Sequence, residues 1–401
     1  MKKILFVMYD LHMAGAEKAL VNLLRACPLE RWEVTVLLVK KRGELLEEVP
    51  AGITVREMEL PEDVRAQILY GSRELLGRYW AERRYRYLAS LLFRLALTRG
   101  QGVDRKTEGL YRRYGKRLPV LAETFDVAVD YQGQGSFATF YVAKKVQAGR
   151  KLSWIHSDFS IVREDCGWLA RWYEEYQGIA AVSGQAEESF RKKFPQLAQR
   201  ARVCHNVIPA ERIREEALAY TVPRRPGINV VTIGRLTPPK GYDVILPVFD
   251  RLNREGIDFH YFMVGEGEDR ELLETMVAGY GLQNRVSLVG LCRNPYPYLR
   301  MCDLYLQPSR WEGFCITLAE ARLFHKAVLA TDFAGAREQI RHRETGILTA
   351  CREEDLYREL RELLLDGGLR QSLEDASRRG GESLWDAGET ISLIEEREVS
   401  G

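Results

Sequence analysis

The feature of this sequence that most limits its fold is a regular alternation of short apolar runs with amphipathic helical patterns. Runs such as residues 229–233 are apolar on both faces, as in the strands of a parallel sheet that helices cover on both sides. Such an alternation is typical of doubly wound α/β domains. The predicted strands are residues 4–9, 34–39, 127–130, 152–155, 179–182, 229–233, 260–264, 286–289, 304–306 and 328–330.

The alternation is interrupted near the middle of the chain, where prolines surround a charged segment. Pro209, Pro223 and Pro226 lie in this stretch, and a new strand–turn–helix pattern begins at Ile228. A chain of 401 residues is long enough for two ordinary domains. The predicted parts are an N-terminal domain at 1–208, a linker at 209–227, a C-terminal domain at 228–380 and a tail at 381–401.

Charge and cysteine content exclude several classes of protein. The 59 Lys and Arg nearly balance the 57 Asp and Glu, so the chain is not a general nucleic-acid coat. The seven cysteines form no C-x-x-C pair, so neither a zinc site nor a disulfide framework is indicated. The first apolar run ends at Asp10, too early for a signal peptide. We therefore expect a cytoplasmic protein without a metal site and without a nucleic-acid partner.

One segment carries an unusual excess of positive charge. Residues 71–118 hold thirteen Lys and Arg against four Asp and Glu, a net charge of +9, within a predicted basic helical insert at about 62–118. A predicted apolar helix face in this segment comprises Leu88, Leu91, Leu92 and Leu95. A basic helix of this kind suits an anionic membrane surface. The alternative is a helix packed on the first domain with solvated arginines. The arginines predicted to contact the membrane are Arg83, Arg84, Arg86 and Arg94.

The motif with the most specific spacing places seven residues between two glutamates. It reads Glu312-Gly313-Phe314-Cys315-Ile316-Thr317-Leu318-Ala319-Glu320 and follows the predicted strand at 304–306. Apolar spacing predicts a helix here, with Glu312 in the preceding loop and Glu320 about one turn inside. Free N–H groups at a helix start bind phosphate, and carboxylates accept hydrogen bonds from sugar hydroxyls. The alternative is that Glu312 only caps the helix and Glu320 is surface-exposed.

A second motif supplies two cations directly after the predicted strand at 229–233. It reads Gly234-Arg235-Leu236-Thr237-Pro238-Pro239-Lys240-Gly241. Open α/β sheets bind ligands at the carboxyl ends of their strands, and two cations this close suit a diphosphate. The segment is not a Walker loop, since no G-x-x-x-x-G-K-[ST] pattern is present. The alternative is a basic turn between a strand and a helix.

Further candidates follow the strands of the first domain. Gly15 lies in a turn that opens a predicted helix, where a missing side chain lets the backbone approach a ligand. His156 follows the strand at 152–155, although a lone histidine is more often structural. Gly133 and Gln134 follow the strand at 127–130. No turn in the chain, including Gly265-Glu266-Gly267, completes the G-x-G-x-x-G fingerprint of a dinucleotide site.

In their order along the chain, these motifs resemble the retaining glycosyltransferases of family 4, which have the GT-B architecture. The matching pieces are Ala14-Gly15-Ala16-Glu17, Trp154-Ile155-His156, Val182-Ser183, His205-Asn206-Val207-Ile208-Pro209, Gly234-Arg235-Leu236 with Lys240-Gly241, Val264-Gly265-Glu266-Gly267 and the E-x(7)-E element. The resemblance implies two Rossmann-like doubly wound domains that face each other across a cleft. The first would bind the acceptor and the second the nucleotide-sugar donor, while the tail would cross back onto the first.

The resemblance also implies roles for individual residues. The implied catalytic residues are Glu312, His156, Arg235 and Lys240. Glu312 would bind the donor sugar, Glu320 the ribose hydroxyls, and the two cations the diphosphate. The residues implied to bind the donor are Gly15, Arg235, Lys240, Leu291, Cys292, Glu312, Gly313, Phe314, Cys315, Ile316, Thr317, Leu318 and Glu320. Many members of the family have glycine where this chain has Cys315, which puts the sugar pocket in question.

We therefore expect a metal-independent transfer that retains the anomeric configuration and needs no cofactor. The expected donor is a nucleotide sugar, with UDP favoured, and the expected acceptor is a glycan or polyprenyl-linked sugar in cell-surface polysaccharide synthesis. The expected location is peripheral, on the inner face of the membrane. The alternatives are a nucleotide-sugar hydrolase or epimerase of the same fold, or a non-catalytic pseudo-transferase subunit. A nicotinamide oxidoreductase lacks its fingerprint.

Overall fold

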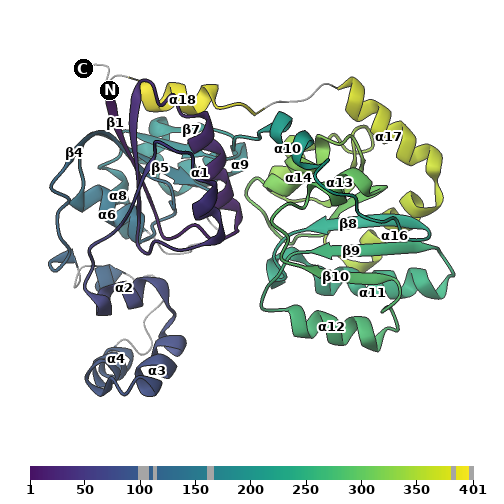
Figure 1. Cartoon of the computed structure of the whole chain (residues 1–401), viewed down its shortest axis with the longest axis horizontal. Coiled ribbons are helices and arrows are strands. Elements are labelled where there is room, and N and C mark those ends of the chain that lie inside the picture. The colour runs from purple at the N-terminus through teal and green to yellow at the C-terminus, as the bar shows by residue number, and fades with distance from the viewer. Residues whose placement is uncertain (98–107, 112–114, 160–166, 381–384, 397–401) are drawn as a thin grey trace. The chain divides into compact units, whose positions relative to one another are not determined.

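The computed structural model describes residues 1–97, 108–111, 115–159, 167–380 and 385–396 (Figure 1). The chain forms two compact units. Unit 1 comprises Met1–Cys204 with Ala387–Gly401, and unit 2 comprises His205–Asp386. Each unit is built on one parallel sheet, as the alternation of apolar runs and helical patterns predicts.

Unit 1 contains a seven-stranded parallel sheet in the order β3-β2-β1-β4-β5-β6-β7. Its strands are β1 (Lys2–Met8), β2 (Trp32–Leu38), β3 (Thr54–Glu57), β4 (Thr124–Asp130), β5 (Gln147–Ile155), β6 (Gly178–Ala181) and β7 (Ala201–Val203). β1 lies in the middle, and Ile4 is in register with both Val34 and Val127. Helices cover both faces, so the apolar side chains of the central strands are fully buried.

The helices of unit 1 include one from the far end of the chain. They are α1 (Gly15–Ala26), α2 (Glu62–Leu69), α3 (Ser72–Ala81), α4 (Tyr85–Leu97), α6 (Phe137–Lys145), α8 (Ala170–Tyr173), α9 (Gly184–Lys193) and α18 (Gly388–Glu395). Short 3-10 turns lie at Glu44–Glu48, Gly167–Leu169 and Pro195–Arg200. α18 is held on unit 1 by Arg150, which donates a hydrogen bond to the carbonyl of Leu393 and pairs with Glu396 at 3.0 Å.

Unit 2 contains a six-stranded parallel sheet in the order β10-β9-β8-β11-β12-β13. Its strands are β8 (Ile228–Ile233), β9 (Phe259–Val264), β10 (Val286–Gly290), β11 (Leu304–Gln307), β12 (Ala327–Thr331) and β13 (Ile347–Thr349). Its helices are α10 (Ala210–Glu216), α11 (Tyr242–Arg254), α12 (Arg270–Gly279), α13 (Tyr296–Met301), α14 (Ile316–Arg322), α15 (Ala334–Gln339), α16 (Glu353–Leu365) and α17 (Gly367–Arg379), with a 3-10 turn at Pro238–Lys240. The packing of α11 and α16 together on the sheet builds much of the apolar core.

All ten predicted strands are present, with their ends shifted by a few residues. Three strands were missed, and all three are edge strands: β3, β7 and β13. Each is three or four residues long, and β3 has no fully buried residue, so their sequences lack a continuous apolar run. Burial on both faces produces the signal that identifies a central strand, and an edge strand lacks it.

The predicted linker at 209–227 is wrong in its first half. These residues lie in unit 2, and α10 buries Ile213 and Ala217. The side-chain amide of Asn294 donates a hydrogen bond to the carbonyl of Glu216 at 2.7 Å and fixes the end of this helix. Two apolar residues among many charged ones therefore suffice to dock the segment on its unit. The boundary between the units falls at Cys204, close to the predicted 208.

The predicted basic insert forms a helical hairpin, α3 and α4, after α2, and Figure 1 shows the hairpin projecting from the sheet of unit 1. Residues 98–107 and 112–114 of the insert lie outside the described residues. Leu75, Tyr79 and Leu91 form a small core between the two helices. Among the helices that the structure describes, none has both the length and the hydropathy of a membrane span.

Candidate active site

The donor motifs of unit 2 lie at the carboxyl ends of two neighbouring strands. β8 leads into Gly234, and β11 leads into a loop at residues 308–315. The strand order reverses here, because β8 has β9 on one side and β11 on the other. Ligands of open α/β sheets bind outside this reversal. The topology therefore brings the two motifs together at the expected position.

Lys240 and Glu312 form an ion pair at this edge, although 72 positions separate them in the sequence. The ammonium nitrogen of Lys240 contacts Oε1 of Glu312, and the Ser309 hydroxyl donates a hydrogen bond to the same oxygen at 2.9 Å. Both charged side chains are only 16% exposed. Burial acts to lower the pKa of Lys240, but the negative charge of Glu312 outweighs it and raises that pKa. Lys240 therefore remains charged at neutral pH.

A buried chain of hydrogen bonds fixes the position of the ion pair. The Tyr305 hydroxyl donates to Oε1 of Gln307 at 2.6 Å, and the Gln307 amide donates to the Ser309 hydroxyl at 2.8 Å. Ser309 then donates to Glu312. The side chains of Gln307 and Ser309 are fully buried. The sequence analysis missed both residues, although polar residues at the end of an apolar strand are the signal that could have identified them.

The segments around the two motifs are also joined by a side-chain ion pair and by a close backbone contact. Arg310 forms two hydrogen bonds of 2.7 Å with the carboxylate of Asp243. Gly241 has φ of +70°, and a Cβ there would lie 2.1 Å from the carbonyl oxygen of Pro308. Only glycine therefore lets the turn after β8 approach the loop after β11 this closely. The distance between Lys240 and Glu312 depends on this contact.

Cys315 has a left-handed backbone conformation directly before α14, with φ of 65°. This region favours glycine, which explains why a glycine serves in many members of the resembled family. Burial, together with the negative charge of Glu312, raises the pKa of the Cys315 thiol to about 12. The thiol is therefore protonated. Within the described ranges, the backbone N–H groups of Phe314 and Thr317 donate to no protein group.

Glu320 is fully buried, so the alternative that it is surface-exposed is wrong. It is the fifth residue of α14, as the spacing predicted, and Glu312 lies in the loop before that helix. The Tyr296 hydroxyl donates a hydrogen bond to Oε1 of Glu320 at 3.0 Å. Tyr296 begins α13, and no sequence signal identified it as a neighbour of the motif.

Two of the remaining donor candidates of unit 2, Arg235 and Leu291, are exposed, whereas Gly313, Phe314, Ile316 and Leu318 are buried. Arg235 is exposed, and its guanidinium has no hydrogen-bond or ion-pair partner among the described residues. Its charge is close enough to act on the pKa of Lys240. Leu291 is 52% exposed just after β10, and the neighbouring Cys292 lies 3.4 Å from the Tyr220 hydroxyl. Arg235 is thus a cation that remains available to a ligand.

Gly15 and His156 lie at the carboxyl edge of the sheet of unit 1. Gly15 is the first residue of α1, and no atom lies within 4 Å of the position of a Cβ there. His156 donates a hydrogen bond from Nε2 to the carbonyl of Tyr131 at 2.6 Å. Burial lowers the pKa of His156 to about 4, so the ring is neutral and Nδ1 is an acceptor. Packing within unit 1 therefore does not require glycine at position 15.

The four arginines predicted to contact a membrane differ in their surroundings. Arg83 and Arg86 are exposed and form no ion pair with any residue in the described part of the chain. Arg84 is bound to both carboxylate oxygens of Glu62, at 2.6 and 2.9 Å. The Arg84 guanidinium already has a carboxylate partner, so its charge is less available to a membrane than those of Arg83 and Arg86. The side chain of Arg94 lies outside what the structure describes.

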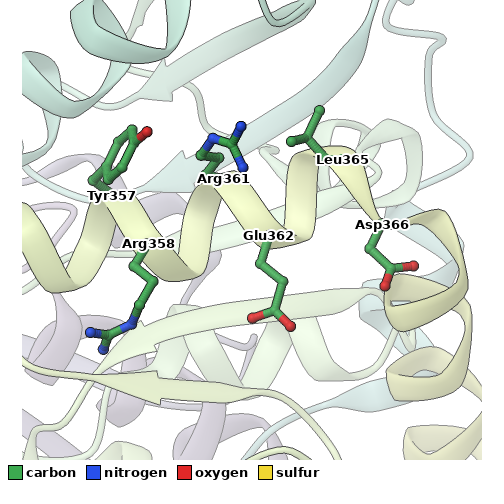
Figure 2. A pocket seen from close by; sticks show the side chains of 6 residues that line it. All are labelled: Tyr357, Arg358, Arg361, Glu362, Leu365 and Asp366. Carbon is green, nitrogen blue, oxygen red and sulfur yellow. The ribbon is translucent and has the colours of Figure 1, made fainter. Parts of the chain in front are cut away.

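A surface hollow of about 700 Å³ lies on α16 and is not a second candidate (Figure 2). Its lining residues are Tyr357, Arg358, Arg361, Glu362, Leu365 and Asp366. Arg361 pairs with Glu255 at 2.7 Å, and Glu362 pairs with Arg343 at 2.8 Å. The side chain of Asp366 accepts a hydrogen bond from the start of α17 at 2.9 Å. These contacts explain the lining as helix packing.

Comparison with protein families matches residues 221–380 to one family, glycosyl transferases group 1. The matched segment contains both donor motifs, the ion pair of Lys240 and Glu312, and the buried Glu320. The donor motifs on which the sequence resemblance rested therefore lie within the segment that matches this family.

Relatives of this domain are named as transferases of sugars. One, from Campylobacter jejuni, is 27% identical over 193 residues, which cover 48% of this chain and 52% of the relative. Its name is N-acetylgalactosamine-N,N'-diacetylbacillosaminyl-diphospho-undecaprenol 4-alpha-N-acetylgalactosaminyltransferase. Another, alpha-D-kanosaminyltransferase of Streptomyces kanamyceticus, is 23% identical over 223 residues, which cover 52% of this chain and 57% of the relative. The chain thus matches about half the length of the curated relatives.

Solved structures share the fold over nearly the whole chain. Alr3699/HepE of Anabaena, crystallised in complex with UDP, has a TM-score of 0.64 at 17% identity and covers 98% of this chain and 100% of its own. TarM of S. aureus has a TM-score of 0.68 at 14% identity and covers 99% and 100%. The predicted GT-B fold is therefore confirmed, with one parallel-sheet domain in each unit.

Proposed function

We propose that this chain is a retaining glycosyltransferase that moves a sugar from a UDP-linked donor to a glycan or lipid-linked acceptor. The observation that carries the proposal is the ion pair of Lys240 and Glu312 beside the exposed Arg235 in a group 1 domain. The pair supplies a buried cation for a phosphate and a carboxylate for a sugar. The names of the relatives support transfer of a sugar as the reaction class.

The leaving group determines what the cations do. When the bond between the anomeric carbon and the diphosphate oxygen breaks, negative charge develops on the diphosphate. Arg235 has a free guanidinium, and the Lys240 ammonium has three N–H donors, so it can bind a phosphate oxygen while it keeps Glu312. Preorganised cations of this kind stabilise the developing charge in a site of low polarity. The proposed transfer therefore needs no divalent cation.

Two carboxylates orient the sugars on either side of the diphosphate. Glu312 is held by Lys240 and Ser309, and its second carboxylate oxygen can accept a hydrogen bond from a hydroxyl of the donor sugar. Glu320 is held by Tyr296 and serves the ribose. Because both groups are fixed before the donor binds, little conformational entropy is lost on binding.

The acceptor completes the reaction on the same face. Its hydroxyl oxygen forms a bond to the anomeric carbon on the side from which the diphosphate departs, and the departing phosphate oxygen takes the hydroxyl proton. Neither an enzymic nucleophile nor a protein base is required. His156 therefore need not act as a base. Its imidazole is neutral, since burial lowers its pKa to about 4.

Donor and acceptor classes are the finer part of the proposal. UDP is the ligand in solved complexes of Alr3699/HepE, which shares the fold. The name of the Campylobacter jejuni relative describes a sugar chain on diphospho-undecaprenol. We take a polyprenyl-linked sugar as the preferred acceptor and the inner face of the membrane as the place of reaction. The unpaired Arg83 and Arg86 in unit 1 agree with an anionic surface there.

Product analysis tests the proposal directly. The protein is first screened against UDP and GDP sugars for thermal stabilisation, since a ligand at about 100 times its Kd adds about 2.7 kcal/mol. The stabilising donor is then incubated with polyprenyl-linked sugars in EDTA, and the anomeric configuration of the product is determined by NMR. We expect an α-linked product from an α-linked donor. Release of free sugar at the same rate with and without acceptor would instead identify a hydrolase.

A further inference from the structure

The outer face of α4 is apolar and faces solvent. The leucines on its inner face, Leu88, Leu91 and Leu95, pack against α3 in the small core of the hairpin. The sequence predicted that Leu92 belongs to the same stripe, but Leu92 lies outside it and is 50% exposed. The next residue, Phe93, is 66% exposed. The helix therefore has two apolar faces, and only one of them is used inside unit 1.

Aromatic residues extend this face to the tip of the hairpin. Trp80, at the end of α3, is 69% exposed, and its ring meets that of Tyr85 edge to face at 6.4 Å. Tyr85 is the first residue of α4 and is exposed as well. The helical spacing of Tyr85 and Leu92 places them one above the other, with Phe93 beside them. We define this set, Trp80, Tyr85, Leu92 and Phe93, as the apolar strip.

Unpaired positive charge borders the apolar strip. Arg83 lies in the turn between the two helices and Arg86 in the first turn of α4, and both lack an ion-pair partner among the described residues. The sequence of α4 contains no Asp or Glu. Arg84, between these two residues, is neutralised by Glu62. Glu82, the acid in the turn, lies 3.7 Å from both Arg78 and Arg84. The charge beside the apolar strip that has no partner among the described residues is therefore that of Arg83 and Arg86.

We propose that the apolar strip is a membrane-binding surface that inserts into an anionic lipid bilayer, with Arg83 and Arg86 at the lipid phosphates. Aromatic and aliphatic side chains on one helix face, with arginines beside them, are the composition of interfacial helices. The positive charge is complementary to anionic headgroups. The proposal deepens the proposed function, since it would hold the transferase at the membrane that carries its acceptor.

The size and shape of the apolar strip favour lipid over a protein partner. Four side chains of this kind, half to two-thirds exposed, present roughly 400–500 Å² of surface. A stable protein interface needs about 800 Å² from each partner. The strip also lies on a convex helical hairpin that projects from the sheet of unit 1 (Figure 1). Fluid acyl chains can cover a convex surface, whereas a protein partner needs a complementary hollow.

Vesicle flotation tests the apolar part of the proposal. The full chain is mixed with vesicles of phosphatidylcholine that contain about 30% phosphatidylglycerol, an anionic content within the physiological range. The variant Leu92→Ser/Phe93→Ser should need at least about tenfold more lipid for half-maximal binding, because two side chains no longer leave water. The matched control is Leu272→Ser/Leu365→Ser, which changes two equally exposed leucines of unit 2 and should bind as wild type.

The arginines give a second test that depends on the structure. Arg83→Gln/Arg86→Gln should weaken flotation by about tenfold and reduce its salt dependence, because each free cation near the surface contributes to binding. Arg84→Gln removes one charge from the same turn, and Glu62 already engages that charge, so it should change flotation less than twofold. An equal loss in Arg84→Gln would overturn the assignment of Arg83 and Arg86.

Three controls make failure informative. Circular dichroism and thermal melting show that the hairpin variants are folded, and UDP binding shows that the donor site is intact. Flotation of Leu92→Ser/Phe93→Ser equal to wild type overturns the proposal, while UDP binding and transfer to a soluble acceptor continue to test the proposed function separately. The proposal is also overturned if the wild type does not float but forms dimers that Leu92→Ser/Phe93→Ser dissociates. The apolar strip would then bind a second copy of this chain.

Discussion

The two units have the same topological feature with opposite chemistry. In each sheet the strand order reverses beside a central strand, at β1 and β4 in unit 1 and at β8 and β11 in unit 2. In unit 2 this edge carries a buried ion pair and a free arginine. In unit 1 it carries His156, whose pKa burial lowers to about 4, and Gly15, which has no side chain. The fold supplies the place for a ligand, and side chains decide which charge the place holds.

This difference agrees with the proposed binding of the donor by unit 2 and of the acceptor by unit 1. A pyrophosphate needs positive charge in a fixed position, and the buried chain from Tyr305 through Gln307 to Ser309 fixes it in unit 2. An acceptor that varies among enzymes needs shape and neutral hydrogen-bonding groups rather than fixed charge. The comparison predicts that substitutions of the charged side chains at the edge of unit 2 affect chemistry, while those of Gly15 and His156 at the edge of unit 1 affect donor binding or the pH dependence of stability.

The largest effect is expected from Lys240→Ala. Loss of the cation that stabilises the leaving group should lower kcat by a factor of about 10²–10³. Glu312→Gln should lower kcat as well, because it breaks the ion pair and leaves Lys240 without its partner. Steady-state kinetics with the stabilising donor measure both effects.

The control for this substitution is Lys326→Ala, which removes a half-buried lysine elsewhere in unit 2 and should leave kcat within about twofold of wild type. Turnover by Lys240→Ala at the wild-type rate would show that the charge at this edge is not catalytic. The contrast drawn between the two units would then be limited to structure.

The second effect contrasts two glycines, one at each edge. Gly241→Ala forces a Cβ within 2.1 Å of the Pro308 carbonyl at positive φ, and should lower the free energy of unfolding of unit 2 by about 3 kcal/mol. Gly15→Ala meets no atom within 4 Å and should leave the free energy of unfolding of unit 1 within about 0.5 kcal/mol. Denaturant unfolding with domain-specific probes measures both.

Donor affinity completes the test of Gly15. If the backbone at this position approaches the donor phosphates, Gly15→Ala weakens donor binding without loss of stability. Titration calorimetry with UDP measures the difference. A variant with unchanged stability and unchanged affinity would remove Gly15 from the donor site.

The third effect is a pH dependence of the stability of unit 1, to which Asp130 and His156 contribute with opposite signs. Burial raises the pKa of Asp130 from its ordinary 3.8 to about 6 and lowers that of His156 from 6.5 to about 4. Between pH 4 and 6 the folded state keeps a proton on Asp130 that the unfolded state has lost, so stability falls as pH rises. Over the same range the unfolded state binds a proton at His156 that the folded state does not, so stability rises with pH.

Single substitutions should separate these opposing slopes. Asp130→Asn leaves the rise with pH, and His156→Gln leaves the fall, each amounting to about 3 kcal/mol between pH 4 and 7. The free energy of unfolding of unit 1, measured by denaturant titration at several pH values, gives the slopes. Parallel curves for wild type and both variants would show that these groups titrate normally.

The smallest effect concerns the thiol next to the ion pair. Glu312 raises the pKa of Cys315 and Lys240 lowers it, while burial raises it most. Glu312→Gln should therefore speed alkylation of Cys315 at pH 8, and Lys240→Ala should slow it. Mass spectrometry after timed iodoacetamide labelling measures the rates, with the half-buried Cys292 as internal reference. A rate that is the same in all three proteins would place the thiol outside the field of the ion pair.

Much of this architecture could be predicted from the sequence because parallel sheets leave a local signal. A central strand is apolar on both faces, so ten strands and the motifs after them could be located without a structure. The E-x(7)-E spacing placed Glu312 in a loop and Glu320 inside a helix, and both are found there. The edge strand β3 left no such signal, because it has no fully buried residue.

Partners that are distant in the sequence could not be predicted. Glu312 pairs with Lys240 across 72 positions, and Arg84 pairs with Glu62 across 22. Neither separation follows a local periodicity that would identify the two residues as partners. The leucines of α4 give the same lesson. Leu91 and Leu92 are adjacent and chemically identical, but only Leu91 meets Leu75 and Tyr79 of α3.

The sequence by itself determined where the chain forms strands and helices, and which loops end at a carboxyl edge, because these follow from the periodicity of neighbouring residues. Only the tertiary structure decided which cations are neutralised, which thiol is buried and which apolar face remains open to solvent. These properties depend on distances between side chains that are far apart in the sequence, and electrostatic energy and apolar burial are both set by those distances.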